Sequence, residues 1–208
     1  MKIMTNEFDS KAKTWDMDAD KILRSQKVGD AILNEIRDIT PCKAFEYGCG
    51  TGLLGLYMHL SFSRLICADT SSGMLDVLKS KISQENIKNV FPVELDLTED
   101  EVPDENYKVI FSMLTLHHVM NIDKILASFH QLLESGGMFF IADLDKEDGS
   151  FHGEGFIGHN GFDREDLKAK VFKAGFKNIR FQTITEIVKE VSKGEKKAFP
   201  LFLMTAEK

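Results

Sequence analysis

The segment Lys43-Ala44-Phe45-Glu46-Tyr47-Gly48-Cys49-Gly50-Thr51-Gly52 is a short apolar run that ends in three glycines at alternate positions. Because glycine has no Cβ, such a loop turns sharply and lets its backbone come within contact distance of a ligand. Residues 53–60 read as a helix whose free N–H groups would face the same spot. This order predicts a strand, a glycine loop and a helix, with a ligand site at the carboxyl end of the strand.

The same alternation continues along the chain. Strand-like apolar runs and helical periods follow one another, and the first helical period is interrupted near Gly29. Ser135-Gly136-Gly137 is expected to end the last helix of this series, and Asp163 and Gly175 are the expected N-cap and stop of one more. The expected strands are 43–47, 64–68, 90–95, 108–114 and 138–142, and the expected helices are 19–38, 53–60, 73–83 and 121–134.

The C-terminal part has a different pattern. Residues 178–191 and 198–205 are rich in Ile, Val, Thr and Phe and are joined by residues 192–196, which predicts a hairpin at the sheet edge. Apolar strands bracketed by helices favour a parallel sheet buried on both faces. We expect an α/β fold, a doubly wound and mostly parallel seven-stranded sheet with an antiparallel last strand. Residues 1–208 are expected to form a single domain, with residues 1–40 as a helical N-terminal extension that acts as a lid.

Composition and charge narrow the function. The chain has 208 residues, of which 43% are hydrophobic and 28% charged. This composition excludes disordered and fibrous proteins. A formal net charge of −7 argues against a nucleic-acid partner, and the absence of a long apolar run argues against a membrane protein. Cys42, Cys49 and Cys67 form no CxxC pair and residues 1–10 have no signal-peptide core, so a cytoplasmic protein with reduced thiols is expected.

Carboxylates follow three of the expected strands. A dinucleotide fingerprint would need a third glycine where this chain has Leu53, so the loop fits a pyrophosphate poorly. Asp69 is placed to accept hydrogen bonds from both hydroxyls of a ribose, and Asp96 from an adenine amine, with Leu97 against the ring. Together with Glu46 they favour a cationic nucleoside. The alternative is that Asp69 caps a helix and Asp96 is a turn residue.

These motifs resemble those of class I S-adenosylmethionine-dependent methyltransferases. The resemblance runs from about residue 43 to 145 and includes Phe111-Ser112-Met113-Leu114 on the fourth strand. It implies a Rossmann-like methyltransferase fold and S-adenosyl-L-methionine as cofactor, with the glycine loop near the methionine moiety, Asp69 on the ribose and Asp96 on the adenine. The cofactor-binding residues expected from the residues and the resemblance together are Trp15, Glu46, Tyr47, Gly48, Cys49, Gly50, Gly52, Leu53, Asp69, Thr70, Met74, Asp96, Leu97, Ser112 and Met113.

Methyl transfer from a sulfonium needs alignment and exclusion of water more than a catalytic triad, and none is visible in the sequence. A base matters only for a protonated acceptor. His117, His118, His152 and His159 are the candidate catalytic residues, with a structural role as the alternative for each. Asp143, Asp145, His152, Glu154 and His159 are a second grouping, around a metal. However, metal-dependent relatives place an acid where this chain has Ser112-Met113-Leu114, so no metal is expected.

The segment from Phe8 to Asp16 resembles the N-terminal lid of small-molecule methyltransferases. Trp15 would either lie near the sulfonium or anchor the N-terminal helix. The leading hypothesis is an enzyme that transfers a methyl group from S-adenosylmethionine to a small-molecule acceptor. An NAD(P)-dependent oxidoreductase and a nucleoside-binding regulatory domain without turnover are the alternatives.

Overall fold

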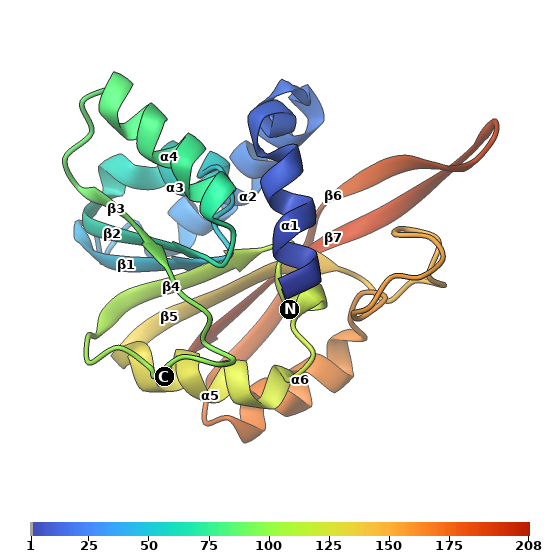
Figure 1. The fold of residues 1–208 in the computed structure, drawn as a ribbon. Helices are drawn as coiled ribbons and strands as arrows, with labels where there is room; N and C mark the ends of the chain where they lie inside the picture. Colours follow the sequence, from blue (N-terminus) through green and yellow to red (C-terminus); the bar gives the residue numbers. More distant parts are fainter. Residues whose placement is uncertain (1) are drawn as a thin grey trace.

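A computed structural model describes residues 2–208, with side chains from residue 7 onward. Its centre is a seven-stranded sheet of order β3-β2-β1-β4-β5-β7-β6 (Figure 1). Strands β1 to β5 are parallel, and β7 is antiparallel to both β5 and β6, which confirms the predicted sheet. The strands are β1 (Cys42–Tyr47), β2 (Phe62–Asp69), β3 (Val90–Glu94), β4 (Tyr107–Met113), β5 (Leu133–Leu144), β6 (Lys177–Ser192) and β7 (Glu195–Glu207).

Helices cover both faces of this sheet (Figure 1). Apolar side chains of α2, α3 and α4 pack on one face together with Ala44 of β1, and those of α5 and α6 pack on the other together with Phe45 and Tyr47. The helices are α1 (Lys2–Lys11), α2 (Ala19–Ile36), α3 (Leu53–Met58), α4 (Ser72–Gln84), α5 (Ile122–Leu132) and α6 (Arg164–Lys173), with short 3-10 helices η1 (Ala12–Met17), η2 (His59–Ser61) and η3 (Leu116–His118).

The sheet has its switch point at β1. This strand pairs with β2 on one side and β4 on the other, so the connections leaving β1 and β4 run to opposite sides of the sheet. A crevice forms at the carboxyl ends of the strands at such a point, and ligands of open α/β sheets bind there. The glycine loop leaves β1 at this position, and α1 lies close to these strand ends in Figure 1.

Several element boundaries differ from the sequence prediction. Helix α2 is not interrupted at Gly29, because this glycine lets α3 approach: a Cβ there would lie 2.6 Å from the ring of Tyr57. Ser135-Gly136-Gly137 does not end a helix but lies within β5, where the Gly136 N–H donates to the Lys208 carbonyl. The connection between β6 and β7 shortens to Lys193 and Gly194.

The predicted helix ends agree with the structure. Asp163 caps α6 by accepting hydrogen bonds from two backbone N–H groups, and Gly175 follows the helix with φ of 103°. Asn121 and Ser71 cap α5 and α4, and each accepts a hydrogen bond from one backbone N–H group. Within residues 2–208, no helix combines the length and the apolar character that crossing a bilayer requires.

Candidate functional site

The glycine loop is built from three glycines with positive φ, at 72° for Gly48, 54° for Gly50 and 81° for Gly52. Side chains rarely adopt such angles, and at Gly48 a Cβ would also lie 2.2 Å from the Thr115 side chain. At Gly50 the situation is the opposite, since no atom lies within 4 Å of the position that a Cβ would take. Gly50 therefore presents bare backbone toward open space at the carboxyl end of β1.

Asp69, the last residue of β2, ties this loop to the next helix. One carboxylate oxygen accepts from the Gly50 N–H at 2.7 Å, and the other accepts from the Ser71 N–H at 2.8 Å. Burial raises the pKa of Asp69, while these N–H groups act to lower it. The Thr70 N–H also bonds to this carboxylate, which has about four lone-pair sites, so one remains to accept a ribose hydroxyl.

Glu46 differs from the expected row of negative charges. Its side chain is buried beneath the loop, where a Cβ on Gly55 would lie 2.2 Å from Glu46 Oε2, and the Cys67 thiol donates to the same oxygen at 3.5 Å. Burial raises the pKa of Glu46 to about 8, so the group is neutral at pH 7. Asp69 and Asp96 are left as the acidic groups at these strand ends.

Asp96 and Leu97 form the turn after β3. The Asp96 carboxylate accepts from both the N–H and the hydroxyl of Thr98, as a turn-forming aspartate does. Leu97 is fully buried, and its backbone hydrogen-bonds Tyr47, whose ring packs in the core against Phe129. The turn is thereby fixed to β1.

The end of β4 lies beside the glycine loop that follows β1. The Ser112 hydroxyl donates to the Tyr47 carbonyl at 2.8 Å and is fully used inside the sheet. Met113 is half-buried beside it. Leu114 follows with φ of 50°, a conformation that is strained for a bulky residue and that concentrates at functional sites. Sequence reasoning missed Leu114, because no residue type there signals a positive φ.

The remaining expected cofactor residues surround this edge of the sheet. Cys49 is buried in the loop, and burial raises the pKa of its thiol well above the ordinary value, so it is inert as a nucleophile. Leu53 begins α3, Thr70 follows Asp69, and Met74 is buried in the first turn of α4, where its N–H donates to the Ser71 hydroxyl.

The N-terminal segment is attached to this edge by two aspartates. Asp9 accepts from the Ser71 hydroxyl at 2.6 Å and from the Gly73 N–H at 2.8 Å, at the start of α4. Asp16 accepts from the Thr51 hydroxyl at 2.5 Å and pairs with Lys81, whose ammonium also donates to the Thr51 carbonyl. Sequence reasoning missed both aspartates, since their partners lie more than thirty residues away in the chain.

The Trp15 ring contacts neighbours within the N-terminal segment. It lies edge-on to Phe8 at 5.9 Å, and the Lys21 ammonium sits 3.8 Å from the ring centre. These contacts are those of an anchor. The ring of Phe8 also lies edge-on to the ring of His118, with 5.3 Å between the two ring centres.

Three histidines converge beside the end of β4. The rings of His117, His118 and His152 lie 4.2 to 5.4 Å apart, centre to centre. His117 Nδ1 lies 2.6 Å from the Asp143 carboxylate, and both side chains are buried. His118 Nδ1 and His152 Nε2 are buried and have no hydrogen-bond partner among the described residues. Burial lowers the pKa of His118 to about 3 and that of His152 to about 4.

The other predicted grouping is not assembled. Both oxygens of Asp145 accept from Arg164 at 2.7 Å, His159 Nε2 lies 3.0 Å from the Val119 carbonyl, and Glu154 is exposed. Among the described residues, the metal-ligand types that come together are instead the three histidines above, whose ligand atoms all lie within 4.8 Å of one another.

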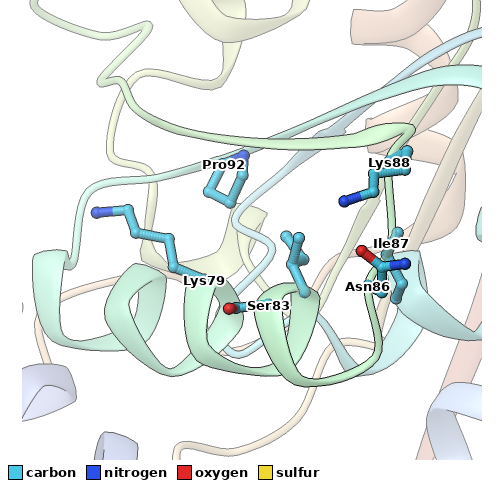
Figure 2. A pocket seen from close by; sticks show the side chains of 7 residues that line it. Lys79, Ser83, Asn86, Ile87, Lys88 and Pro92 are labelled. Atoms are coloured by element: carbon cyan, nitrogen blue, oxygen red, sulfur yellow. The ribbon is translucent and has the colours of Figure 1, made fainter.

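A surface hollow of about 310 Å³ lies elsewhere, between α4 and β3 (Figure 2). Figure 2 shows Lys79 of α4 and Pro92 of β3 on its walls. None of its lining residues belongs to the strand-end site, so we assign it no role in that site. The residues that line it are Lys79, Ile82, Ser83, Asn86, Ile87, Lys88 and Pro92.

Comparison with known proteins agrees with this geometry. A family model described as a methyltransferase domain matches residues 45–141, just under half of the chain, which include the glycine loop and the strand-end aspartates. Over these residues the chain is similar to methyltransferase domains. It is 24% identical over 166 residues to an uncharacterised methyltransferase of Schizosaccharomyces pombe, which covers 72% of this chain and 58% of that protein.

Solved structures share the fold of this chain. A chain in the Haloferax volcanii complex between the Trm112 methyltransferase activator and a methyltransferase superposes with a TM-score of 0.76 at 14% identity, covering 97% of each chain. A Haemonchus contortus phosphoethanolamine N-methyltransferase, in complex with S-adenosyl-L-methionine, superposes with a TM-score of 0.69 at 16% identity, covering 86% of this chain and 52% of that one. At these identities the likeness shows the methyltransferase fold.

Proposed function

We propose that this protein is a methyltransferase that transfers the methyl group of S-adenosylmethionine to a small-molecule acceptor. The observation that carries the proposal is the glycine loop at the end of β1, which we call the cradle. Its Gly50 backbone faces open space and is held by Asp69. Asp69 and Asp96 would bind the ribose and the adenine, and their negative charge favours a cationic donor over a pyrophosphate. The similar Haemonchus contortus enzyme, which is named for a small phosphorylated amine, supports a small acceptor.

The residues around the donor would act mainly by placing the reactants. The attacking atom of the acceptor must lie in line with the bond from sulfur to the methyl carbon, and water must be kept out. In this proposal the N-terminal segment is the lid, held closed over the loop by Asp9 and Asp16. In this proposal the acceptor enters beside η3, next to His117, His118 and His152, which are three of the four histidines predicted as catalytic.

Calorimetry with S-adenosylhomocysteine tests the donor site directly. Gly50→Ala places a methyl group in the cradle, and Gly194→Ala is a matched control, since Gly194 also has a positive φ and no atom within 4 Å of a Cβ. Both variants should lose about 1–2 kcal/mol of stability from backbone strain. Only Gly50→Ala should weaken the binding of S-adenosylhomocysteine, by at least about tenfold, or roughly 1.4 kcal/mol. Equal affinity in the two variants would count against the cradle.

The reaction itself is tested with isotopically labelled donor and a cell metabolite extract. A labelled small molecule supports the proposal and identifies the acceptor. Binding of S-adenosylhomocysteine without any labelled product would favour a regulatory domain, and binding of NAD in its place would favour an oxidoreductase. Label appearing in protein or RNA would refute the small-molecule acceptor.

A further inference from the structure

We propose that His117, His118 and His152 form a binding site for a divalent transition-metal ion of the zinc type. The proposal departs from the sequence-based expectation of no metal. It depends on the three side chains alone, and therefore stands apart from the identity of the methyl donor. Their ligand atoms all lie within 4.8 Å of one another, and an ion with bonds of about 2.0–2.1 Å would draw the three nitrogen atoms closer together.

The nitrogen atoms themselves point to a missing partner. His118 Nδ1 and His152 Nε2 are buried, and neither has a hydrogen-bond partner among the described residues. A buried polar atom without a partner is costly, so proteins rarely leave two of them side by side. A metal ion bound between the rings would satisfy both nitrogen atoms at once.

His117 is oriented as a metal ligand commonly is. Its Nδ1 is occupied by Asp143 at 2.6 Å, and Asp143 is itself fixed by the backbone N–H groups of Leu144 and His117. The carboxylate selects the tautomer with the proton on Nδ1, which leaves the Nε2 lone pair for an ion. Carboxylate–histidine pairs of this kind orient the ligands of many metal centres.

The chemistry of the three side chains agrees with ligation. Imidazole is a preferred ligand of zinc and of its neighbours in the periodic table.

Different elements hold the three rings in place. His117 and His118 lie in η3, directly after Thr115, which contacts the glycine loop. His152 lies in the connection between β5 and α6, where Phe156 stacks on its ring at 3.8 Å. Three histidines from two converging segments form a ligand set that leaves a fourth coordination position of a tetrahedral ion for water or a substrate atom.

The location suggests what would occupy that fourth position, a step that rests on the proposed function. The cluster follows the strand that lines the acceptor side, and Phe8 of the lid contacts His118. An ion there would bind an oxygen or sulfur donor of the acceptor and stabilise its deprotonated form, because a bound cation lowers the pKa of its ligands. The acceptor class would then be a small alcohol, phenol or thiol.

Metal titration of the purified full chain tests the site without any methyl donor. After treatment with a chelator, the protein should bind one Zn²⁺ per chain, and Co²⁺ should give the intense visible bands of a tetrahedral ion. His152→Gln should abolish these bands and weaken Zn²⁺ binding at least tenfold. Asp143→Asn, a positioning variant, should weaken Zn²⁺ binding by about 10- to 100-fold.

His130→Gln is the matched control, since His130 lies on α5 in contact with Phe176 and away from the cluster. It should bind Zn²⁺ and Co²⁺ as the unchanged protein does. Absence of stoichiometric binding in the unchanged protein would overturn the proposal, as would Co²⁺ bands that survive His152→Gln. Calorimetry with S-adenosylhomocysteine on the same samples separates this failure from a failure of the donor site, and circular dichroism shows that each variant is folded.

Discussion

Replacing Glu46 by glutamine should remove a loss of folding stability that grows as the pH rises. The carboxyl is 2% exposed, and its pKa rises from an ordinary 4.5 to about 8 in the folded protein. Because this pKa is raised, the folded protein binds the proton more tightly than the unfolded chain does. Below pH 4.5 the carboxyl is protonated in both states, so it takes nothing from the free energy of unfolding. As the pH rises from 4.5 to about 8, only the unfolded state releases the proton, and the folded state becomes less stable.

The magnitude follows from the width of that interval. At about 1.4 kcal/mol per pH unit, Glu46 costs on the order of 3 kcal/mol of the free energy of unfolding at pH 7 and on the order of 5 kcal/mol above pH 8. Glutamine has the same shape, cannot ionise and keeps an oxygen that accepts a hydrogen bond. The stability advantage of Glu46→Gln should therefore grow by about 1.4 kcal/mol per pH unit between pH 5 and 8 and then level off.

Urea unfolding between pH 5 and 9 measures this difference. Glu101→Gln, which replaces an exposed carboxylate in the connection between β3 and β4, is the control and should differ from the unchanged protein by a constant amount. If the advantage of Glu46→Gln is also constant across this range, Glu46 titrates alike in the folded and unfolded states, and its placement as a neutral buried group is refuted.

Two further substitutions test the ribose contact and the attachment of the N-terminal segment. Asp69→Asn replaces one of the oxygens that hold Gly50 and Ser71 by an amide donor, so calorimetry should show S-adenosylhomocysteine binding weakened by roughly 30-fold, about 2 kcal/mol. Unchanged affinity alongside a lower melting temperature would reduce Asp69 to a turn-capping residue. Asp16→Ala removes the hydrogen bond to Thr51 and the ion pair with Lys81. It should speed amide hydrogen exchange in residues 8–17 and raise the dissociation rate of S-adenosylhomocysteine about tenfold; unaltered exchange in that segment would show that Asp16 does not hold it.

The sheet was predictable because local signals agree with the global fold. Apolar runs mark the strands, and the glycines after β1 have the positive φ angles that only glycine adopts readily. Asp163 caps its helix as its residue type and position suggest. Boundaries were missed where tertiary contacts decide. The Gly136 N–H pairs with the C-terminal residue, which extends β5 through a sequence that resembles a turn, and Gly29 serves packing against Tyr57 instead of breaking α2.

The site was predictable only in part, for the same reason. Asp69 follows a strand directly, so its position at the sheet edge can be read from the sequence. The neutral state of Glu46 depends on the close approach of Gly55, which no periodicity reveals. The histidine cluster requires a connection from β5 to fold back over η3, and it selects His152 while His159 bonds to a backbone carbonyl instead. The sequence analysis named every histidine of the cluster as a candidate, but it did not predict which of its candidates lie in contact.

A crystal structure of the protein with S-adenosylhomocysteine tests the donor site most directly. We expect the ribose hydroxyls on Asp69, the adenine beside Asp96 and Leu97, and the homocysteine moiety against the Gly50 backbone. A ligand bound away from this edge of the sheet, with Asp69 still bonded to backbone N–H groups and not to the ligand, would contradict it.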